Sequence, residues 1–405
     1  MMKHDLRAFI VLGLLIMQLS VVGEAAYGST GKNLALFGGF MLVNFVFLLT
    51  LLIGRAKSLI PPYLKLIVII LPMEIIIVAK QPDMMSLNNY IFRFICYDLL
   101  FVSIACARLP IKSSKLTEWI YHILIPTVII LASSIYMSKI NSIAASAVGR
   151  ITGGDDISAV GVAFCLCLAG SISIGFLFVT QKLKYRIYHG FALLSTLPPV
   201  IVSGSRGALL SLILVFAFFY FTQVVLAKSL RKKRDYFMLV LPWIGFFSFA
   251  FYIIRNPFLL RQIELLIRRV SSLSETGDDV SSRARFNILN NYFSNFDDFW
   301  LIGISDYSGL YPHNFFLDFF IRYGLYGVVL SLTVYFLVIK VTVNFQKTLV
   351  TPLHSSLFAV VLFSFLNAQT SLTLEFMRFF WFALSFLLIN VFWQYKGFYK
   401  NVNFR

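Results

Sequence analysis

The sequence predicts an all-α, polytopic membrane protein with about twelve transmembrane helices and one large loop outside the bilayer. Of its 405 residues, 59% are hydrophobic and 13% are charged, whereas roughly a quarter of the residues in soluble domains are charged. With so few charged residues, a soluble protein of this size could not cover its surface with charge. Apolar runs recur along the chain. Their lengths are close to the roughly 20 residues that a helix needs to cross a bilayer core.

The predicted spans extend from the N-terminal region to residue 394. The first begins with basic residues, as a signal peptide does, but eleven more spans follow it, and we expect it to be a retained helix. The twelve ranges are 6–23, 34–53, 65–79, 89–107, 118–137, 157–180, 187–202, 207–226, 236–254, 317–339, 353–369 and 374–394.

Lys and Arg residues concentrate in every second connection between the spans. The connection around 182–186 holds three and the one around 228–234 holds five, whereas each short connection on the opposite side holds two at most. The positive-inside rule then predicts that both termini are cytoplasmic. The net charge of +17 follows from this topology and needs no nucleic-acid partner, because the basic side faces anionic membrane lipid.

We interpret residues 1–405 as a single transmembrane domain in which 255–312 is the only long connection. The cytoplasmic connections are too short to form a nucleotide-binding domain, and no Gly-rich phosphate-binding motif is present in the sequence. We therefore expect any chemistry at the outer face or within the helix bundle.

All the basic residues of the long loop are arginines. The planar guanidinium group suits phosphate and carboxylate groups, so the loop could bind an oxyanion; alternatively the arginines pair with the seven acidic residues nearby. The arginines are Arg255, Arg261, Arg268, Arg269, Arg283 and Arg285, and the acids are Glu264, Glu275, Asp278, Asp279, Asp297, Asp298 and Asp306.

Two segments of this loop have the periodicity of amphipathic helices. Residues 258–270 place Leu259, Ile263, Leu266 and Val270 on one face, which fits a helix lying in the membrane interface. Residues 281–296 form the second segment, with Ser281 and Ser282 as candidate caps. Arg283 and Arg285 then fall in its first turn, where cations oppose the helix dipole unless an anion binds there.

Two further positions at the predicted outer face could take part in chemistry. Arg206 lies in the glycine-flanked turn 204–207, where it could approach a headgroup, or it could be an ordinary snorkelling arginine. Pro312 fits the first turn of the next helix. His313 would then lie at a helix N-terminus, where the positive dipole end favours a neutral imidazole that can accept a proton; alternatively it is a structural residue.

The run Ser203–Leu210 (SGSRGALL) resembles the Ser-Arg-Gly signature of the O-antigen ligase and polymerase family. The segment that begins with His313 and Asn314, followed by nine residues, Gly324, two residues and Gly327, is similar to that family's His-Asn-x9-Gly-x2-Gly pattern. The order of the motifs around the long loop also matches. The two motifs cover a small part of the chain, while the shared topology covers all of it.

The resemblance implies a membrane glycosyltransferase that acts on glycans linked to undecaprenyl diphosphate at the periplasmic face of the bacterial inner membrane. Such an enzyme needs no metal and no other cofactor, and a chain-length regulator protein is a candidate partner. The loop 255–312 would then be periplasmic. The resemblance implies His313, Arg206, Arg283 and Arg285 as catalytic residues and Ser205, Asn314, Gly324 and Gly327 as substrate-binding residues.

In the mechanism that the resemblance implies, Arg206 and either Arg283 or Arg285 bind the diphosphate and stabilise the charge that develops as it leaves. His313 accepts the proton of the attacking sugar hydroxyl. The anomeric carbon is expected to invert.

Three functions remain open at this point. A polymerase joins repeat units on the lipid carrier, and a ligase transfers the finished glycan to lipid A-core. Only nine residues separate Gly303 from His313, and this segment is often longer in ligases, which favours a polymerase. A flippase would more typically contain internal repeats or charged residues within its spans. No repeat is present, and the mid-span acids Glu74 and Asp98 could pair with Arg93 or Arg378, or line a cavity.

Overall fold

A computed structural model describes residues 118–140, 159–225, 233–271, 280–303, 312, 314–344, 352–370, 379–381, 383–384 and 387–388. This part of the chain is all helical, with no strand among its residues. The first four predicted spans and most of the last one lie outside the described residues.

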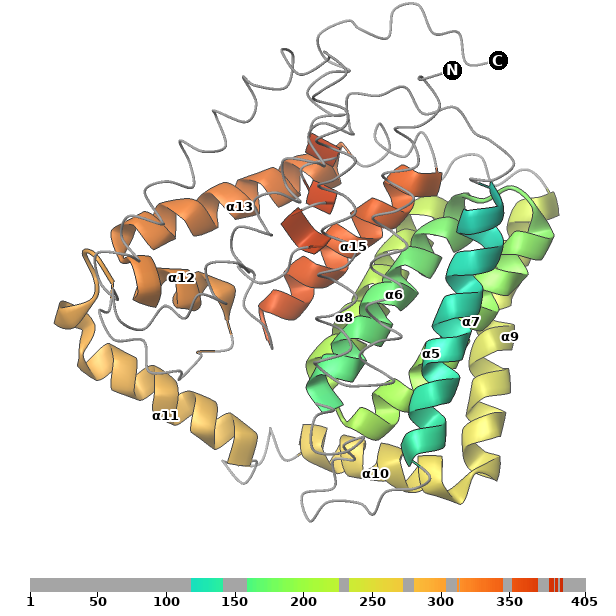
Figure 1. Cartoon of the computed structure of the whole chain (residues 1–405), viewed down its shortest axis with the longest axis horizontal. Coiled ribbons are helices and arrows are strands. Elements are labelled where there is room, and N and C mark those ends of the chain that lie inside the picture. The colour runs from blue at the N-terminus through green and yellow to red at the C-terminus, as the bar shows by residue number, and fades with distance from the viewer. Residues whose placement is uncertain are drawn as a thin grey trace, which may run out of the picture.

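The described helices form a bundle with an extension along one side (Figure 1). Four of them are long and apolar enough to cross a membrane: Ile120–Ser138, Val160–Val179, Arg206–Gln223 and Leu325–Val343. They coincide with predicted spans, in the last case with part of one, and the protein has the character of an α-helical membrane protein. The bundle consists of α5 (Ile125–Ile140), α6 (Ala159–Val179), α7 (Leu183–Ser203), α8 (Arg206–Tyr220), α9 (Lys233–Arg255) and α15 (Pro352–Ala368).

Helix α6 is the centre of this bundle, and α15 packs tightly along it. A Cβ atom added to Gly175 would lie 2.3 Å from the Cα atom of Ser356, so the two backbones touch. Farther along the same pair, the rings of Phe164 and Phe363 are 5.7 Å apart. Residue numbers thus rise along α6 as they fall along α15, and the two helices are antiparallel. Small residues at such a contact allow close packing of helices in membranes.

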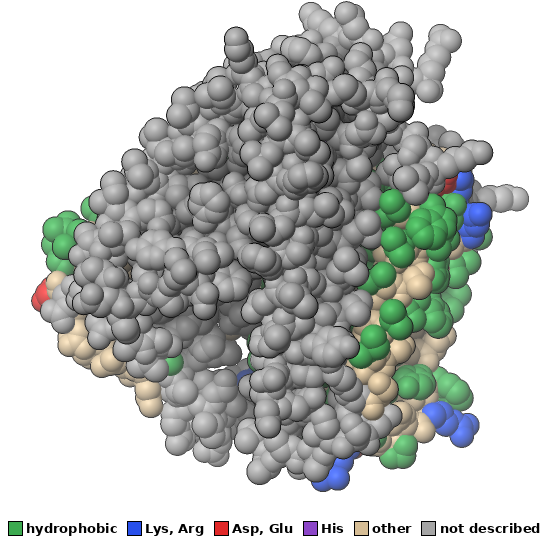
Figure 2. All heavy atoms as spheres, in the orientation of Figure 1, with side chains coloured by type: hydrophobic (Ala, Val, Ile, Leu, Met, Phe, Trp, Pro, Cys, Tyr) green, Lys and Arg blue, Asp and Glu red, His purple; other side chains and the backbone are tan. Residues whose placement is uncertain are grey.

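One face of α13 (Leu325–Val343) is apolar and exposed along its whole length. Its exposed residues recur every three or four positions, which is the pattern expected of a helix that faces lipid on one side. These residues are Leu325, Val329, Leu332, Phe336, Ile339 and Val343. Figure 2 shows a similar apolar area on the right side of the bundle, with Lys and Arg side chains at its two ends. This distribution is typical of a membrane-crossing surface.

The two ends of the bundle differ in their polar residues. At one end, which we call the His189 end, Lys182 pairs with Glu118, and the Nδ1 atom of His122 lies 3.2 Å from the Nε2 atom of His189. These contacts join the beginning of the α5 segment to α7. At the opposite end, which we call the Arg206 end, α7 turns into α8, and α10 (Pro257–Ser271) crosses beneath α7 and α9 (Figure 1).

Helices are present at both predicted positions between 255 and 312, namely α10 and α11 (Val280–Ser294). Because α11 begins at Val280, the prediction that Ser281 and Ser282 cap it is wrong; both serines lie inside the helix. In α10, Leu259 is fully buried in the bundle core, whereas Ile267 is 60% exposed. The predicted apolar face of α10 therefore packs at least partly on protein rather than on lipid.

The predicted span 317–339 is wrong as one continuous helix. The structure divides it into α12 (Phe315–Tyr323) and α13, separated at Gly324, which has a φ of 59°. A Cβ atom on Gly324 would lie 2.3 Å from the carbonyl oxygen of Leu301, and one on Gly303 would lie 2.2 Å from that of Arg322. The amide of Leu325 also donates a hydrogen bond of 3.1 Å to Leu301. These contacts hold the segment before residue 304 against the break between the two helices.

Replacing Gly324 with alanine should lower the melting temperature of the purified protein in detergent. The positive φ of this position alone costs a non-glycine residue about 1–3 kcal/mol, and the added methyl group would also meet the Leu301 backbone. Gly190→Ala is the matched control, because a Cβ atom there would meet only a leucine methyl group 3.9 Å away. Equal melting temperatures for the two variants would contradict the packing described for Gly324.

Candidate functional site

The predicted tight turn before Arg206 is present. Helix α7 ends at Ser203, and Gly204 follows with a φ of 64°, the left-handed conformation that glycine adopts most easily. Ser205 is extended, and α8 begins with Arg206. The Ser203 hydroxyl accepts a hydrogen bond of 3.3 Å from the amide of Ser205. The turn thus fixes Arg206 as the first residue of a helix.

This position gives the beginning of α8 a positive electrostatic character. The side chain of Ser205 makes no capping hydrogen bond to the first turn of α8. The dipole of α8 is directed with its positive end toward this turn, and the guanidinium group of Arg206 adds a full charge. A helix N-terminus of this kind, with an arginine in its first turn, is suited to binding a phosphate group.

Several other elements end on the same side of the bundle. The rings of Phe219 and Phe358 are 5.9 Å apart near the His189 end, so α8 and α15 are antiparallel, like α6 and α15. The C-terminus of α15 therefore lies at the Arg206 end, together with the N-terminus of α6 at Ala159. Two parallel helices, α6 and α8, direct their positive ends toward this side.

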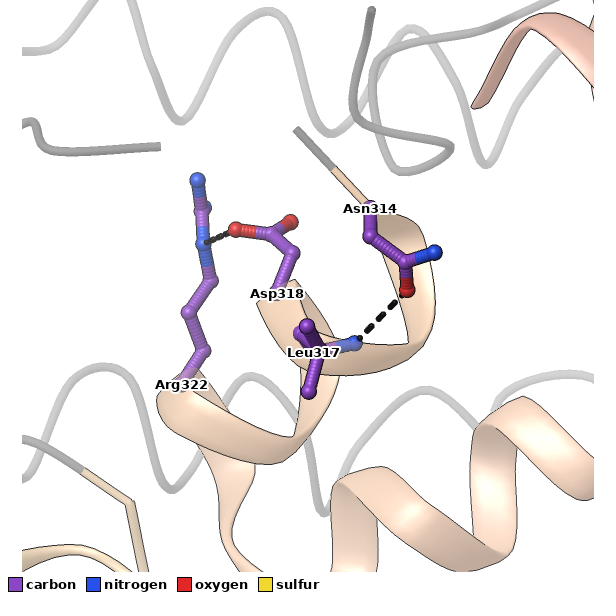
Figure 3. A network of polar contacts seen from close by, with 4 residues as sticks. All are labelled: Asn314, Leu317, Asp318 and Arg322. Atoms are coloured by element: carbon purple, nitrogen blue, oxygen red, sulfur yellow. Dashed lines mark hydrogen bonds and ion pairs between the residues drawn. The ribbon is translucent and has the colours of Figure 1, made fainter. Parts of the chain in front are cut away.

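The beginning of α12 is defined by Asn314. Its side-chain oxygen accepts hydrogen bonds of 3.0 Å from the amide of Phe316 and 3.2 Å from that of Leu317, which makes it the N-cap; the second is drawn in Figure 3. Pro312 thus lies before the cap, and the prediction that it occupies the first helical turn is wrong. His313 directly precedes the cap in sequence, but it lies outside the described residues.

The cap residue is also linked to two other helices through Gln369. The Nδ2 atom of Asn314 donates to the Oε1 atom of Gln369 at 3.4 Å, and the Tyr335 hydroxyl donates to the same oxygen at 3.0 Å. Gln369 follows the last residue of α15, and Tyr335 belongs to α13. The start of α12 is therefore attached to the Arg206 end of the bundle.

A buried ion pair within α12 is a feature that the sequence analysis missed. Asp318 is fully buried, and the Nε atom of Arg322 donates to its Oδ1 atom at 2.9 Å (Figure 3). Tyr292 of α11 lies close enough for the pair to affect it: burial raises the pKa of the Tyr292 phenol, the Asp318 carboxylate raises it further, and Arg322 opposes the increase. The pair thus belongs to the contact between α11 and α12.

Aromatic rings complete this contact. The rings of Phe299 and Phe320 are 5.4 Å apart, and those of Phe296 and Phe320 are 5.9 Å apart. The segment that directly follows α11 is therefore packed against α12, whereas positions 283 and 285 lie in the first turns of α11, at the other end of that helix. The helix backbone at Arg283 and Arg285 is described, while their side chains lie outside the described part of the structure.

The two motif glycines have a packing role. Besides Gly324, Gly327 lies so close to α12 that an added Cβ atom would be 1.9 Å from the carbonyl oxygen of Phe319. The spacing of the two glycines thus matches the close crossing of α12 and α13. Their assignment to substrate binding, and that of Ser205 and Asn314, stays a prediction.

The described contacts place Ser205 and Arg206 at the turn into α8 and attach Asn314 to the same end of the bundle, whereas Gly324 and Gly327 lie where α12 meets α13, at the other end of α12. Among the described residues, no group of three or more His, Cys, Asp or Glu side chains is arranged to hold a metal ion. In comparisons with known proteins, the chain matches no family model and no curated protein sequence.

Proposed function

We propose that this protein is a membrane glycosyltransferase that polymerises oligosaccharide repeat units linked to undecaprenyl diphosphate. The main support is Arg206 at the N-terminus of α8, where the Ser205 side chain makes no capping hydrogen bond, on the same side of the bundle as the cap residue that follows His313. In this proposal the helix end binds the diphosphate, and His313 is the proton acceptor on the same side. A diphosphate leaving group and an attacking sugar hydroxyl need these two functions.

The proposal includes the finer topology. Twelve spans would cross the bacterial inner membrane, with both termini in the cytoplasm and the Arg206 end at the periplasmic face. Residues 255–312 would be the large periplasmic loop. The amphipathic helix α10 supports this arrangement, because Asn256 caps its start and Leu259 anchors it across the bundle end. Its exposed residues Arg261 and Glu264 would face the periplasm.

In the proposed reaction, a hydroxyl oxygen of the acceptor sugar attacks the anomeric carbon of the donor glycan. A new glycosidic bond forms, the bond from that carbon to the diphosphate oxygen breaks, and the configuration inverts. His313 accepts the hydroxyl proton. Undecaprenyl diphosphate leaves with the bonding electrons, and Arg206 together with Arg283 or Arg285 stabilises the negative charge.

The short segment after Gly303 favours polymerisation over ligation to lipid A-core. Gly303 is packed against the Arg322 backbone, and Asn314 is tied to Gln369, so the connection begins and ends at fixed points. Only nine residues lie between Gly303 and His313. So short a connection leaves little chain for a separate lipid A-core site beside the diphosphate.

Gel analysis of lipopolysaccharide from a strain that lacks this protein tests the assignment. Loss of a polymerase should leave core capped with a single repeat unit. Loss of a ligase should instead leave uncapped core and retain polymer on the lipid carrier, while loss of a flippase should leave uncapped core without periplasmic polymer. We expect the single-repeat pattern, and the wild-type gene supplied on a plasmid should restore the full ladder.

A further inference from the structure

One amide at the Arg206 end of the bundle is buried without a hydrogen-bond partner among the residues that the structure describes. The side chain of Asn367, next to the last residue of α15, is 1% exposed. Both its Oδ1 and its Nδ2 atoms lack a partner. A buried serine hydroxyl can bond to a carbonyl of its own helix, as Ser356 does with Leu353. An amide nitrogen can do the same, as that of Asn344 does with Lys340, but an amide oxygen needs a donor from elsewhere.

The position of Asn367 relates it to the candidate site. It lies two residues before Gln369, the residue that binds both Asn314 and Tyr335. Asn367 is buried on the face of α15 that packs on α6, as Phe363 is, whereas the partly exposed Gln369 contacts α12 and α13. Since α15 is antiparallel to α8, Asn367 is also at the same end of the bundle as Arg206.

Burial of both halves of an amide without hydrogen bonds is costly, and the great majority of buried polar side-chain atoms in proteins have a partner. Such exceptions are concentrated at functional sites, where a bound molecule completes the hydrogen bonds. A neutral amide that can donate and accept is matched by sugar hydroxyl and acetamido groups, which also donate and accept. A phosphate group would instead be matched by arginine or a helix N-terminus.

We propose that Asn367 binds a hydroxyl or acetamido group of the lipid-linked sugar at the Arg206 end of the bundle, where α15 packs on α6. This inference rests on the proposed function, because it assigns the sugar to one part of the site and the diphosphate to the arginines.

Asn367→Leu tests this proposal, because leucine has nearly the shape of asparagine but cannot form hydrogen bonds. If Asn367 serves a ligand, the melting temperature of the purified variant in detergent should be equal to or above that of the wild type, since the variant no longer buries unpaired polar atoms. The yield of polymer in a complemented deletion strain should nevertheless fall about tenfold, as expected for one lost hydrogen bond. Ser355→Ala is the matched control, because it removes an equally unpartnered buried hydroxyl from the other end of α15 and should leave polymer yield unchanged.

Ligand-induced thermal shifts provide a second measurement that does not depend on turnover. Undecaprenyl diphosphate without sugar should stabilise the Asn367→Leu variant as much as the wild type. The additional stabilisation by the same lipid carrying one repeat unit should be lost in the variant only.

Two results would overturn the proposal. Normal polymer yield from Asn367→Leu would show that the amide contacts no substrate, and a lower melting temperature would show that it supports the fold. Failure of the proposed function would look different from either result, because Arg206→Ala would then also leave the glycan ladder intact.

Discussion

Replacing His313 with alanine is expected to abolish long-chain glycan in a complemented deletion strain. A general base in a glycosyl transfer contributes about 10²–10⁴-fold to the rate, and a loss of this size leaves too few transfer steps to build a ladder. The residue precedes the Asn314 cap, whose hydrogen bonds to Phe316 and Leu317 fix the start of α12. The effect should be visible as core with a single repeat on a lipopolysaccharide gel.

The control for this prediction is His4→Ala, which changes a histidine in the predicted cytoplasmic N-terminal segment. It should give a normal ladder at the same expression level. A normal ladder from His313→Ala, at wild-type abundance in the membrane, would remove the general base from the proposed mechanism.

Replacing Arg206 with alanine should also eliminate long-chain glycan. Loss of one preorganised group that stabilises a developing negative charge costs about 10²–10³-fold in rate. Arg206→Lys keeps the positive charge but loses the planar fork of donors, so it should retain a shortened ladder. The matched control is Arg261→Ala, because Arg261 is an exposed arginine on α10 at the same end of the bundle.

Comparing Arg206→Ala with Arg261→Ala distinguishes a specific diphosphate site from general attraction of an anionic lipid. If positive charge at this face were sufficient, Arg206→Ala and Arg261→Ala would shorten the ladder equally. The turn geometry predicts otherwise, because Gly204 and Ser205 fix Arg206 on a helix N-terminus, where charge and dipole act together.

Much of the helical architecture could be predicted because apolar runs determine it. The spans predicted at 157–180 and 207–226 agree with α6 and with the segment Arg206–Gln223. The break between α12 and α13 could not be predicted this way. Gly324 lies in an apolar run without proline, and its positive φ matches a close contact with the Leu301 backbone, which is a tertiary feature.

The candidate site was predictable where short motifs determine local geometry. The glycine before Ser205 indicated the turn that makes Arg206 the first residue of α8. The exact helix starts were less predictable, as Pro312 illustrates, because helix ends depend on which side chain supplies the cap.

Polar residues inside apolar segments were missed for a different reason. The spacing of Asp318 and Arg322 by four residues is compatible with an ion pair on a helix, but the sequence does not show that the aspartate is buried beside α11. Asn367 likewise has no distinguishing neighbours in the sequence. Its significance depends on burial without a partner, which only the three-dimensional structure reveals.

Polymerisation by the purified protein tests the central claim most directly. The protein would be reconstituted in liposomes and given one undecaprenyl-diphosphate-linked repeat unit in the presence of EDTA and without nucleotide. We predict lipid-linked oligomers of increasing length, with the anomeric configuration of each new linkage inverted relative to the donor. Absence of oligomers unless a divalent metal or nucleotide is added, or retention of the anomeric configuration, would contradict the proposed mechanism.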